Sequence, residues 1–369
     1  MATEITLTSA VPSEIWEQIA HKYSFYSSPS WLHFSDSDCI ATAAYIVASV
    51  DHEVRALLPA YWSPHENNVL YQPPAPDLLI LGGRRGYLSA PLLATPADAL
   101  LLRDMVAAAI ERFPEAQGRW WWPYVLDNGA RLIAEVFSFD EDHIALAGAD
   151  AVIDVPNGGV AEHIDRLTSQ QRRTNARREL RRFQESGFYI DEAPLGDQAK
   201  VLGPLLSQVQ QRYGHDHGPF QMTALLERQS AYLQESSVVF RCRRQSDDTI
   251  VGFSLGYRRG HELAIRVVGF DYAAVENIGA YASLSIYAPI DYCARSGLSI
   301  LHLGMESLDA KSRRGARVRP LWELSTQCFS ESQRNSRTAV IDQLPAREAE
   351  DFVHATSSLR AQIAKSAAR

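Results

Sequence analysis

The chain has 369 residues, of which 46% are hydrophobic and 22% are charged, and its formal net charge is −8. This is the composition of an ordinary globular protein, and the length predicts about two domains. We expect no membrane-spanning helix, because no apolar run approaches about 18 residues.

Neither the first residues nor the cysteines indicate a secretory signal or a metal site. The first residues lack a basic segment followed by an apolar run, so no secretory signal is expected. Cys39, Cys242, Cys293 and Cys328 are far apart and form no CxxC pair, which argues against structural zinc. We therefore expect free thiols, a cytoplasmic location, no metal and no cofactor.

The predicted elements of the first part alternate helices with a β-meander. In order they are a helix at 13–23, strands at 39–50 and 53–62, a helix at 96–113 and a strand at 118–125. The chain divides near residue 150, where a strand-like run meets the turn Pro-Asn-Gly-Gly.

The second part repeats this rhythm more clearly. Helices are predicted at about 165–186, 196–213 and 221–234, strands at 237–244, 249–259 and 262–271, a helix at 278–296 and a short strand at 298–304. The residues from Pro345 to Arg369 are predicted to form a terminal helix.

The chain resembles the GNAT acyltransferase fold in the order of its predicted elements, which are helices, an antiparallel meander, one helix and a further strand. We therefore expect an α/β (α+β) protein of two GNAT-like units in tandem, each a mostly antiparallel mixed sheet flanked by helices. The expected domains are a degenerate first unit at 1–150, a second, catalytic unit at 151–345 and a C-terminal helix at 346–369.

Residues 169–188 form the most unusual segment, since this acidic chain places six arginines within eleven positions there. At about 100° per residue, most of these arginines fall on one half of a helix and a narrow apolar stripe falls on the other. A solvated helix face is one interpretation, although like charges this close destabilise a helix. The other is an anion site, with Arg173, Arg177 and Arg181 as phosphate ligands.

A second basic segment lies at 311–319 and contains Lys311 and four arginines but no acid. It follows the last predicted strand of the second unit, where it would close the groove of an acyltransferase of this kind. Arg313, Arg314 and Arg317 are predicted to hold phosphates there. A mobile basic loop with no ligand is the alternative.

The turn at 276–281 stands where GNAT enzymes have a glycine-rich turn for the pyrophosphate of coenzyme A. Here it begins with Glu276 and ends with Tyr281. A carboxylate beside a pyrophosphate is unfavourable, so the sequence argues against coenzyme A binding in the standard manner. Asp271, Tyr272 and Tyr281, at the junction of the meander and the next helix, are predicted to line an acceptor pocket.

Four segments occur in an order that resembles the Fem-like branch of the GNAT superfamily. They are the arginine helix ending in "ESGFYI", the strand "VVGFDY", the helix with "ASLSIYAPIDYCARSG" and the stretch "HLGMESLDAKSRRGARVRP". The branch contains aminoacyl-tRNA-dependent peptidyltransferases and relatives that attach an amino acid to small molecules. The resemblance implies that Lys311 polarises the carbonyl of the bond being formed.

The resemblance predicts an aminoacyltransferase that uses aminoacyl-tRNA as donor and forms an amide on an amine of a small metabolite or peptide. The long coiled-coil insertion of the peptidoglycan-type members is missing here, which favours a compact member acting on a small acceptor, as in natural product biosynthesis. An N-acyltransferase with acyl-CoA or an acyl carrier protein as donor is one alternative. A non-catalytic RNA- or anion-binding module is the other.

Overall fold

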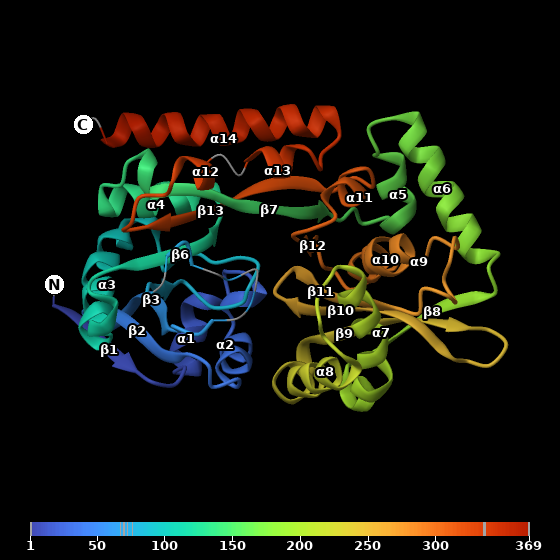
Figure 1. Cartoon of the computed structure of the whole chain (residues 1–369), viewed down its shortest axis with the longest axis horizontal. Helices are drawn as coiled ribbons and strands as arrows, with labels where there is room; N and C mark the ends of the chain where they lie inside the picture. Colours follow the sequence, from blue (N-terminus) through green and yellow to red (C-terminus); the bar gives the residue numbers. More distant parts are fainter. Residues whose placement is uncertain are drawn as a thin grey trace. The chain divides into compact units, whose positions relative to one another are not determined.

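A computed structural model describes residues 2–367 except 67, 69, 70, 72, 76, 335 and 336 (Figure 1). The chain divides into two compact units, of which unit 1 comprises Met1–Asp150 and Val318–Arg369 and unit 2 comprises Ala151–Arg317. Across the described part of the chain, no helix is long and apolar enough to cross a membrane.

Unit 1 is built on a mixed sheet with the strand order β1-β2-β3-β4-β6-β13-β7. The strands are β1 (Thr3–Thr8), β2 (Thr42–Val50), β3 (Glu53–Trp62), β4 (Leu79–Leu81), β6 (Trp120–Val125), β7 (Ile144–Asp154) and β13 (Arg317–Ser325), and β5 (Leu92–Leu93) pairs with β3. The β4–β6 pairing is parallel and the β6–β13 pairing is antiparallel. All six residues of β6 are buried, so this apolar strand lies in the core.

The helices of unit 1 are α1 (Ser13–Ala20), α2 (Pro29–Asp36), α3 (Leu101–Arg112), α4 (Asp127–Phe137), α12 (Glu331–Arg334), α13 (Arg337–Ile341) and α14 (Ala346–Ala367). Helix α3 packs against β2 and β3, and the long α14 packs against α4. Helix α4 is strongly amphipathic because Ala130, Ile133 and Ala134 share one buried face.

Unit 2 carries the strand order β12-β11-β10-β9-β8, and the end of β7 from Ala151 pairs antiparallel with β12. Its strands are β8 (Phe188–Ala193), β9 (Ser237–Arg244), β10 (Ile250–Arg259), β11 (Glu262–Phe270) and β12 (Ile300–Gly304). From β8 to β11 the pairing is antiparallel, whereas β11 and β12 run parallel. This is the predicted mixed sheet.

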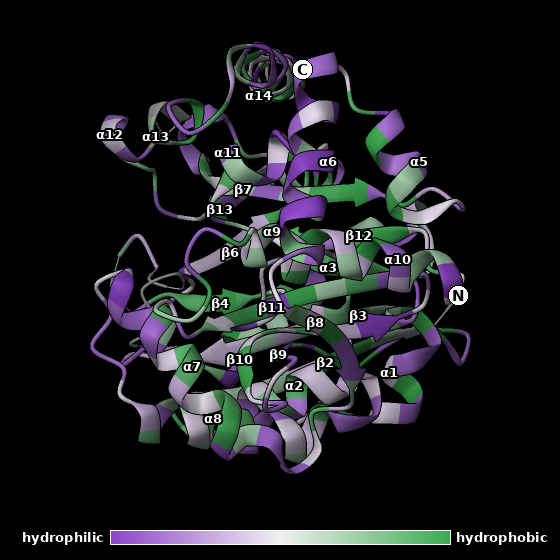
Figure 2. Cartoon of the chain, turned by 90° about the vertical axis from the view of Figure 1, so that its right-hand side faces the viewer, coloured by the Kyte–Doolittle hydropathy of each residue, from purple (hydrophilic) through white to green (hydrophobic). Residues whose placement is uncertain are grey.

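The helices of unit 2 are α5 (Gly159–Asp165), α6 (Gln170–Gln184), α7 (Ala199–Arg212), α8 (Pro219–Leu233), α9 (Ala280–Ala282), α10 (Ala288–Arg295) and α11 (Leu308–Ser312). Figure 2 shows that hydrophobic residues gather on the strands, whereas α6 is mostly hydrophilic. The sheet is covered on both faces, as two glycines demonstrate. A Cβ on Gly269 would meet the backbone of α7, whereas one on Gly252 would meet Leu284 from the helix at 280–295.

The helix at 280–295 contains a π-helical turn, Ser283–Tyr287, between α9 and α10. Pro289 lies at the start of α10 and cannot donate a backbone hydrogen bond to the preceding turn. The sequence predicts a kink at this proline, and a π-helical turn just before it is the form that the irregularity takes. Turns of this kind occur frequently at functional sites.

The observed division differs from the predicted domains at residue 345. The segment from Val318 onward lies in unit 1, because β13 pairs with β6 and α14 packs on α4. The basic segment at 311–319 is also not one loop, since α11 and β13 contain its two ends.

Candidate active site

The central feature of unit 2 is a fork between two parallel strands. Strands β11 and β12 pair over only three residues, and the last pair is Ala264 with His302. Beyond it β11 runs on to Phe270, and among the described residues β10 alone pairs with it there, whereas β12 runs on to Gly304. The separated strands therefore leave backbone N–H and C=O groups of β11 without a strand partner on the side of the fork.

Each strand has a β-bulge where the fork opens. In β11 the extra residue is Arg266, because Leu255 pairs with Val267 and Gly256 with Ile265. In β12 the register against β7 shifts between His302 and Gly304. Bulges redirect backbone groups and are frequent beside active sites, so the fork can present donors to a polar group lying between the strands.

Lys311 holds the turn that follows β12. Its buried ammonium donates to the carbonyl oxygens of Leu303 (2.8 Å), Gly304 (3.2 Å) and Met305. This turn is strained, since Glu306 and Ser307 both have positive φ, at 54° and 49°. The three ammonium protons all face carbonyl oxygens, so this arrangement favours a positioning role over the predicted direct contact with a substrate carbonyl.

Arg314 forms a half-buried ion pair with a carboxylate from the arginine helix. Its guanidinium donates to both carboxylate oxygens of Glu179, at 3.0 and 2.6 Å, and to the Ala310 carbonyl oxygen at 2.7 Å. The Tyr287 hydroxyl, from the π-helical turn, donates to the same carboxylate at 2.8 Å. Burial alone would lower the pKa of Arg314, but the Glu179 carboxylate raises it instead. Arg314 therefore joins α6 to the segment after β12, and its guanidinium is engaged by protein groups, while its phosphate contact stays a prediction.

Tyr281 lies beside this ion pair. Burial raises its pKa to about 12, opposed by the nearby Arg314 guanidinium and by a hydrogen bond with the Ser307 side chain. Its ring centroid is 6.5 Å from that of Phe270, at the end of β11. Of the three predicted pocket residues, Tyr281 is thus the one whose surroundings include Arg314 and the strained turn.

The other two predicted pocket residues have local structural partners. Asp271 accepts hydrogen bonds from the backbone N–H groups of Ala273 and Ala274 and so caps its own turn. Tyr272 lies under the guanidinium of Arg212, 4.3 Å from its ring centroid, and burial raises its pKa.

The arginines of α6 divide into engaged and exposed groups. Arg173 donates to the Leu167 carbonyl oxygen at 2.6 Å, and Arg177 pairs with the exposed Asp165 at 2.6 Å. Arg181 is exposed and has no hydrogen bond or ion pair with any residue that the structure describes. Arg178 and Arg182 are also exposed, and their contacts with Asn175 and Asn277 are long, at 3.5 and 3.3 Å. The solvent face of α6 is therefore cationic, while Ala176 and Phe183 are buried.

The remaining predicted phosphate ligands lie close to acids. Arg313 is exposed and pairs with Asp309 at 2.7 Å, and Arg317 is exposed and lies 3.4 Å from Asp154. Both pairs are on the surface, where ion pairs contribute little free energy and exchange readily.

The turn at 276–281 packs against α6. Gly279 has a φ of 78°, and a Cβ there would lie 3.4 Å from the Glu179 backbone oxygen. Arg182 reaches the Asn277 carbonyl oxygen at 3.3 Å, and Glu276 is exposed. The turn is thus partly covered by protein backbone, which adds to the unfavourable carboxylate of Glu276.

Sequence reasoning missed Glu179 and Tyr287, which hold Arg314, and Arg266 and His302, which mark the fork. The only available signals were a lone acid inside the arginine helix and polar residues inside apolar strands. The described residues contain no group of three or more His, Cys, Asp or Glu side chains that could hold a metal ion.

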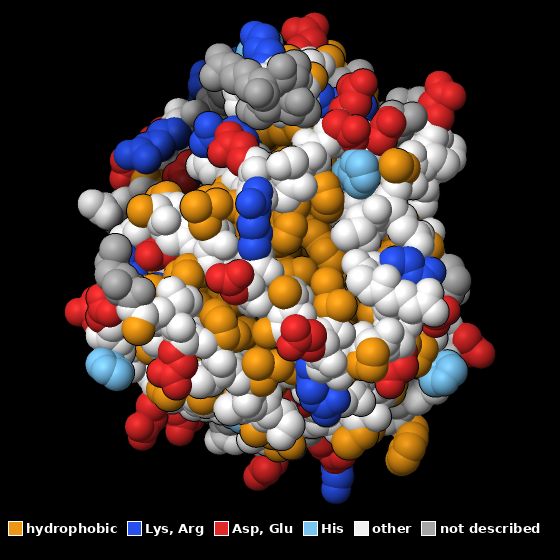
Figure 3. Space-filling model, turned by 90° about the vertical axis from the view of Figure 1, so that its left-hand side faces the viewer, with side chains coloured by type: hydrophobic (Ala, Val, Ile, Leu, Met, Phe, Trp, Pro, Cys, Tyr) orange, Lys and Arg blue, Asp and Glu red, His pale blue; other side chains and the backbone are white. Residues whose placement is uncertain are grey.

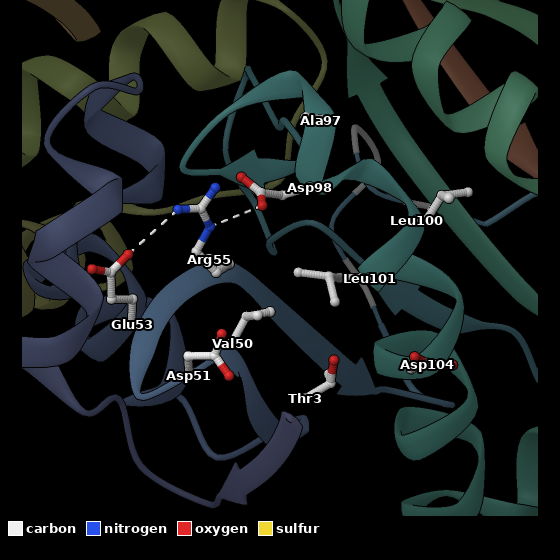
Figure 4. A pocket seen from close by; sticks show the side chains of 10 residues that line it. All are labelled: Thr3, Val50, Asp51, Glu53, Arg55, Ala97, Asp98, Leu100, Leu101 and Asp104. Carbon is white, nitrogen blue, oxygen red and sulfur yellow. Dashed lines mark hydrogen bonds and ion pairs between the residues drawn. The ribbon is translucent and has the colours of Figure 1, made fainter. Parts of the chain in front are cut away.

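A surface pocket of unit 1 is lined by none of the candidate-site residues described above. It has a volume of about 570 Å³ and lies between the β2–β3 turn and the start of α3 (Figure 4). Its one cation, Arg55, is paired with Asp98 at 2.9 Å and with Glu53 at 3.6 Å. On the face that Figure 3 shows, hydrophobic side chains lie in a shallow hollow bordered by separate charged ones.

Comparisons with known proteins agree with this geometry. Residues 170–312 match the family described as acetyltransferase (GNAT) domain. Crystal structures with similar folds include FemX, at 9% identity and a TM-score of 0.62, covering 89% of this chain and 97% of that one. No curated protein matches the sequence significantly.

Two further structures each align with 89% of this chain. One is the C-terminal domain of an Agrobacterium fabrum protein provisionally assigned as a lysylphosphatidylglycerol synthetase, at 13% identity, 93% coverage and a TM-score of 0.54. The other is a tandem GNAT protein from the clavulanic acid biosynthesis pathway, at 9% identity, 100% coverage and a TM-score of 0.50.

Unit 2 thus carries an acetyltransferase-type (GNAT) domain over residues 170–312, which indicates an acyltransferase. The fold of the chain is that of FemX and the tandem GNAT proteins, so the predicted resemblance to the Fem-like branch is confirmed at the level of the fold.

Proposed function

We propose that the protein transfers an aminoacyl group from aminoacyl-tRNA to an amine of a small metabolite or peptide and forms an amide. The observation that carries the proposal is the division of charge on α6. Arg177, Arg178, Arg181 and Arg182 are exposed, and at about 100° per residue Arg177 and Arg181 lie opposite Glu179, which pairs with Arg314. A small donor lying in the fork could not reach them, whereas a large polyanion lying across the helix could.

The chemistry at the fork needs little from side chains. The acceptor nitrogen attacks the ester carbonyl, the carbon–oxygen bond to the tRNA ribose breaks, and the ribose oxygen takes up the proton that the nitrogen loses. An ester is already activated, so orientation and stabilisation of the developing oxyanion carry the reaction. N–H groups of β11 beyond Ala264 would stabilise it, with Lys311 fixing the turn opposite and Tyr281 lining the acceptor side.

The experiment is binding of aminoacyl-tRNA to the full chain at several salt concentrations. The triple variant R178A/R181A/R182A is compared with a charge-matched control, R166A/R244A/R295A, which removes arginines that are paired with acids elsewhere in unit 2. Three lost phosphate contacts should reduce the slope of log Kd against log salt by about 2 to 3. Equal slopes for the two variants, or no binding by the wild-type protein, would refute the proposed donor.

A second donor is favoured by one observation, the match of unit 2 to an acetyltransferase domain. Coenzyme A or a carrier protein would then supply a thioester to the same fork. Titration with coenzyme A separates the two, because the covered turn at 276–281 and Glu276 should prevent tight binding. Saturable binding of coenzyme A, together with no detectable binding of aminoacyl-tRNA, would favour this alternative.

A further inference from the structure

A thiol, an imidazole and a carboxylate lie in a row at the surface of unit 1. The Cys328 Sγ atom lies 3.8 Å from Nε2 of His143. The other ring nitrogen of His143, Nδ1, lies 2.7 Å from Oδ1 of Asp140. Because 185 residues separate Cys328 from His143 along the chain, it is the folding of unit 1 that brings the row together.

Backbone contacts hold the two segments that carry this row. His143 ends the 3₁₀ turn Glu141–His143 just before β7, and Cys328 lies between β13 and α12. The Phe329 N–H donates to the Asp142 carbonyl oxygen at 2.8 Å, and the Phe329 side chain is buried. The residues next to the thiol and next to the imidazole are therefore fixed to one another.

Asp140 and Phe139 orient the imidazole ring. Asp140 begins the 3₁₀ turn, where Oδ1 also accepts a hydrogen bond from the Asp142 N–H at 3.0 Å. The Phe139 ring is stacked on the imidazole of His143, with 4.8 Å between the centroids. The hydrogen bond with His143 lowers the pKa of Asp140. A carboxylate at Nδ1 favours the tautomer that carries its proton there, which leaves the lone pair of Nε2 facing the thiol.

The thiol of Cys328 is open to solvent. Cys328 and Cys39 are exposed, whereas Cys242 and Cys293 are buried, and burial raises the pKa of each of these two to about 12. A reagent in solution can therefore reach two of the four thiols of the folded protein. Cys39 is an internal reference, because its thiol makes no hydrogen bond with any residue that the structure describes.

We propose that Cys328, His143 and Asp140 form a modification site that reacts with small organic disulfides. A nucleophile, a base within hydrogen-bond reach and a carboxylate that orients the base are the arrangement that activates a cysteine. Exchange between sulfur atoms develops no oxyanion, so these three groups are sufficient for it. The inference is independent of the proposed aminoacyl transfer, since neither α6 nor the fork contributes a residue.

The exchange balances within this row. Nε2 of His143 takes the proton of the Cys328 thiol, and the thiolate attacks one sulfur of the disulfide. The sulfur–sulfur bond of the reagent breaks, and a mixed disulfide forms at Cys328. The released thiolate takes the proton back from the imidazolium. The sulfur of Cys328 is oxidised, and the reagent supplies the sulfur that is reduced.

The test measures the rate of mixed-disulfide formation at each cysteine of the full-length protein. The probe is bis(2-hydroxyethyl) disulfide, which carries no charge, and mass spectrometry of the peptides gives the rates at Cys328 and Cys39. The reaction is run at pH 6, where an ordinary thiol is almost wholly protonated and an adjacent base matters most. We expect Cys328 to react about tenfold faster than Cys39.

Variants of the row give the comparison its specificity. His143→Gln removes the base and Asp140→Asn removes the carboxylate that orients it, so both should slow the reaction at Cys328 and leave Cys39 unaffected. His21→Gln, which changes an exposed histidine after α1, is the matched control and should alter neither rate.

Three outcomes would overturn the inference. They are equal rates at Cys328 and Cys39 in the wild-type protein, no adduct on Cys328, and an unchanged rate at Cys328 in His143→Gln. The first two need no variant. Adducts on the buried Cys242 and Cys293 would identify a variant that has unfolded, so loss of the fold cannot be mistaken for loss of the base.

Discussion

Replacing Glu323 by glutamine should make the stability of unit 1 less dependent on pH. Burial raises the pKa of Glu323 to about 7 from an ordinary value of 4.5, although the Trp121 hydrogen bond opposes this. Below about pH 4.5 the carboxyl is protonated in both the folded and the unfolded chain and carries no penalty. As the pH rises towards 7 the unfolded chain ionises first, so folding stability falls, and the loss levels off above pH 7.

The size of this effect follows from the two pKa values. Raising the pKa of a carboxyl from 4.5 to about 7 corresponds to about 3 kcal/mol between its protonation states. Between pH 5 and pH 8 the wild-type protein should therefore lose about 2.5 kcal/mol relative to Glu323→Gln, which cannot ionise.

Urea unfolding followed by tryptophan fluorescence measures this difference. All seven tryptophans lie in unit 1, so the signal follows the unit that contains Glu323. Glu14→Gln, which changes an exposed residue of α1, controls for the loss of one negative charge. Parallel stability curves for the wild-type protein and Glu323→Gln across pH 5–8 would show that the carboxyl is not in an apolar environment.

The other predictions concern single contacts. Arg314→Ala should destabilise unit 2 by about 2 kcal/mol, because it leaves the half-buried carboxylate of Glu179 without its bidentate partner. The control Arg313→Ala, at an exposed position, should cost about 0.5 kcal/mol or less. Circular dichroism during urea unfolding compares the two variants. Lys311→Met removes the donor to three carbonyl oxygens and should cost about 2 kcal/mol or more in the same assay; a stable variant with lost transfer activity would instead favour direct catalysis. Ser138→Gly should stabilise unit 1 by about 0.5–1 kcal/mol, since Ser138 ends α4 with a φ of 55°, and tryptophan fluorescence would reveal a failure to do so.

Local patterns in the sequence were sufficient for much of the fold. The strands β3 and β9 have the predicted bounds, because each is a short, mostly apolar run bounded by polar residues. Helical periodicity likewise predicted that α6 buries Ala176 and Phe183 and exposes arginines. In both cases the information lies within a few residues of the chain.

Contacts between distant residues could not be predicted in this way. Glu179 and Arg314 are 135 residues apart, and nothing near either residue indicates the other. Lys311 looked like a free cation in a basic loop, but its position next to the end of β12 buries its ammonium. The start of β13 looked like part of the same loop because Arg317 and Arg319 mask the apolar residues that follow.

The order of the two units along the chain has a consequence for synthesis. Unit 2 is one continuous segment, Ala151–Arg317, whereas unit 1 needs residues from both sides of it. On the ribosome, unit 2 is complete before β13 emerges, although the first strands of unit 1 were made long before. The buried strand β6 must therefore wait about 200 residues for its partner β13, which makes the nascent chain slow to fold and prone to aggregation until about its last seventh has emerged.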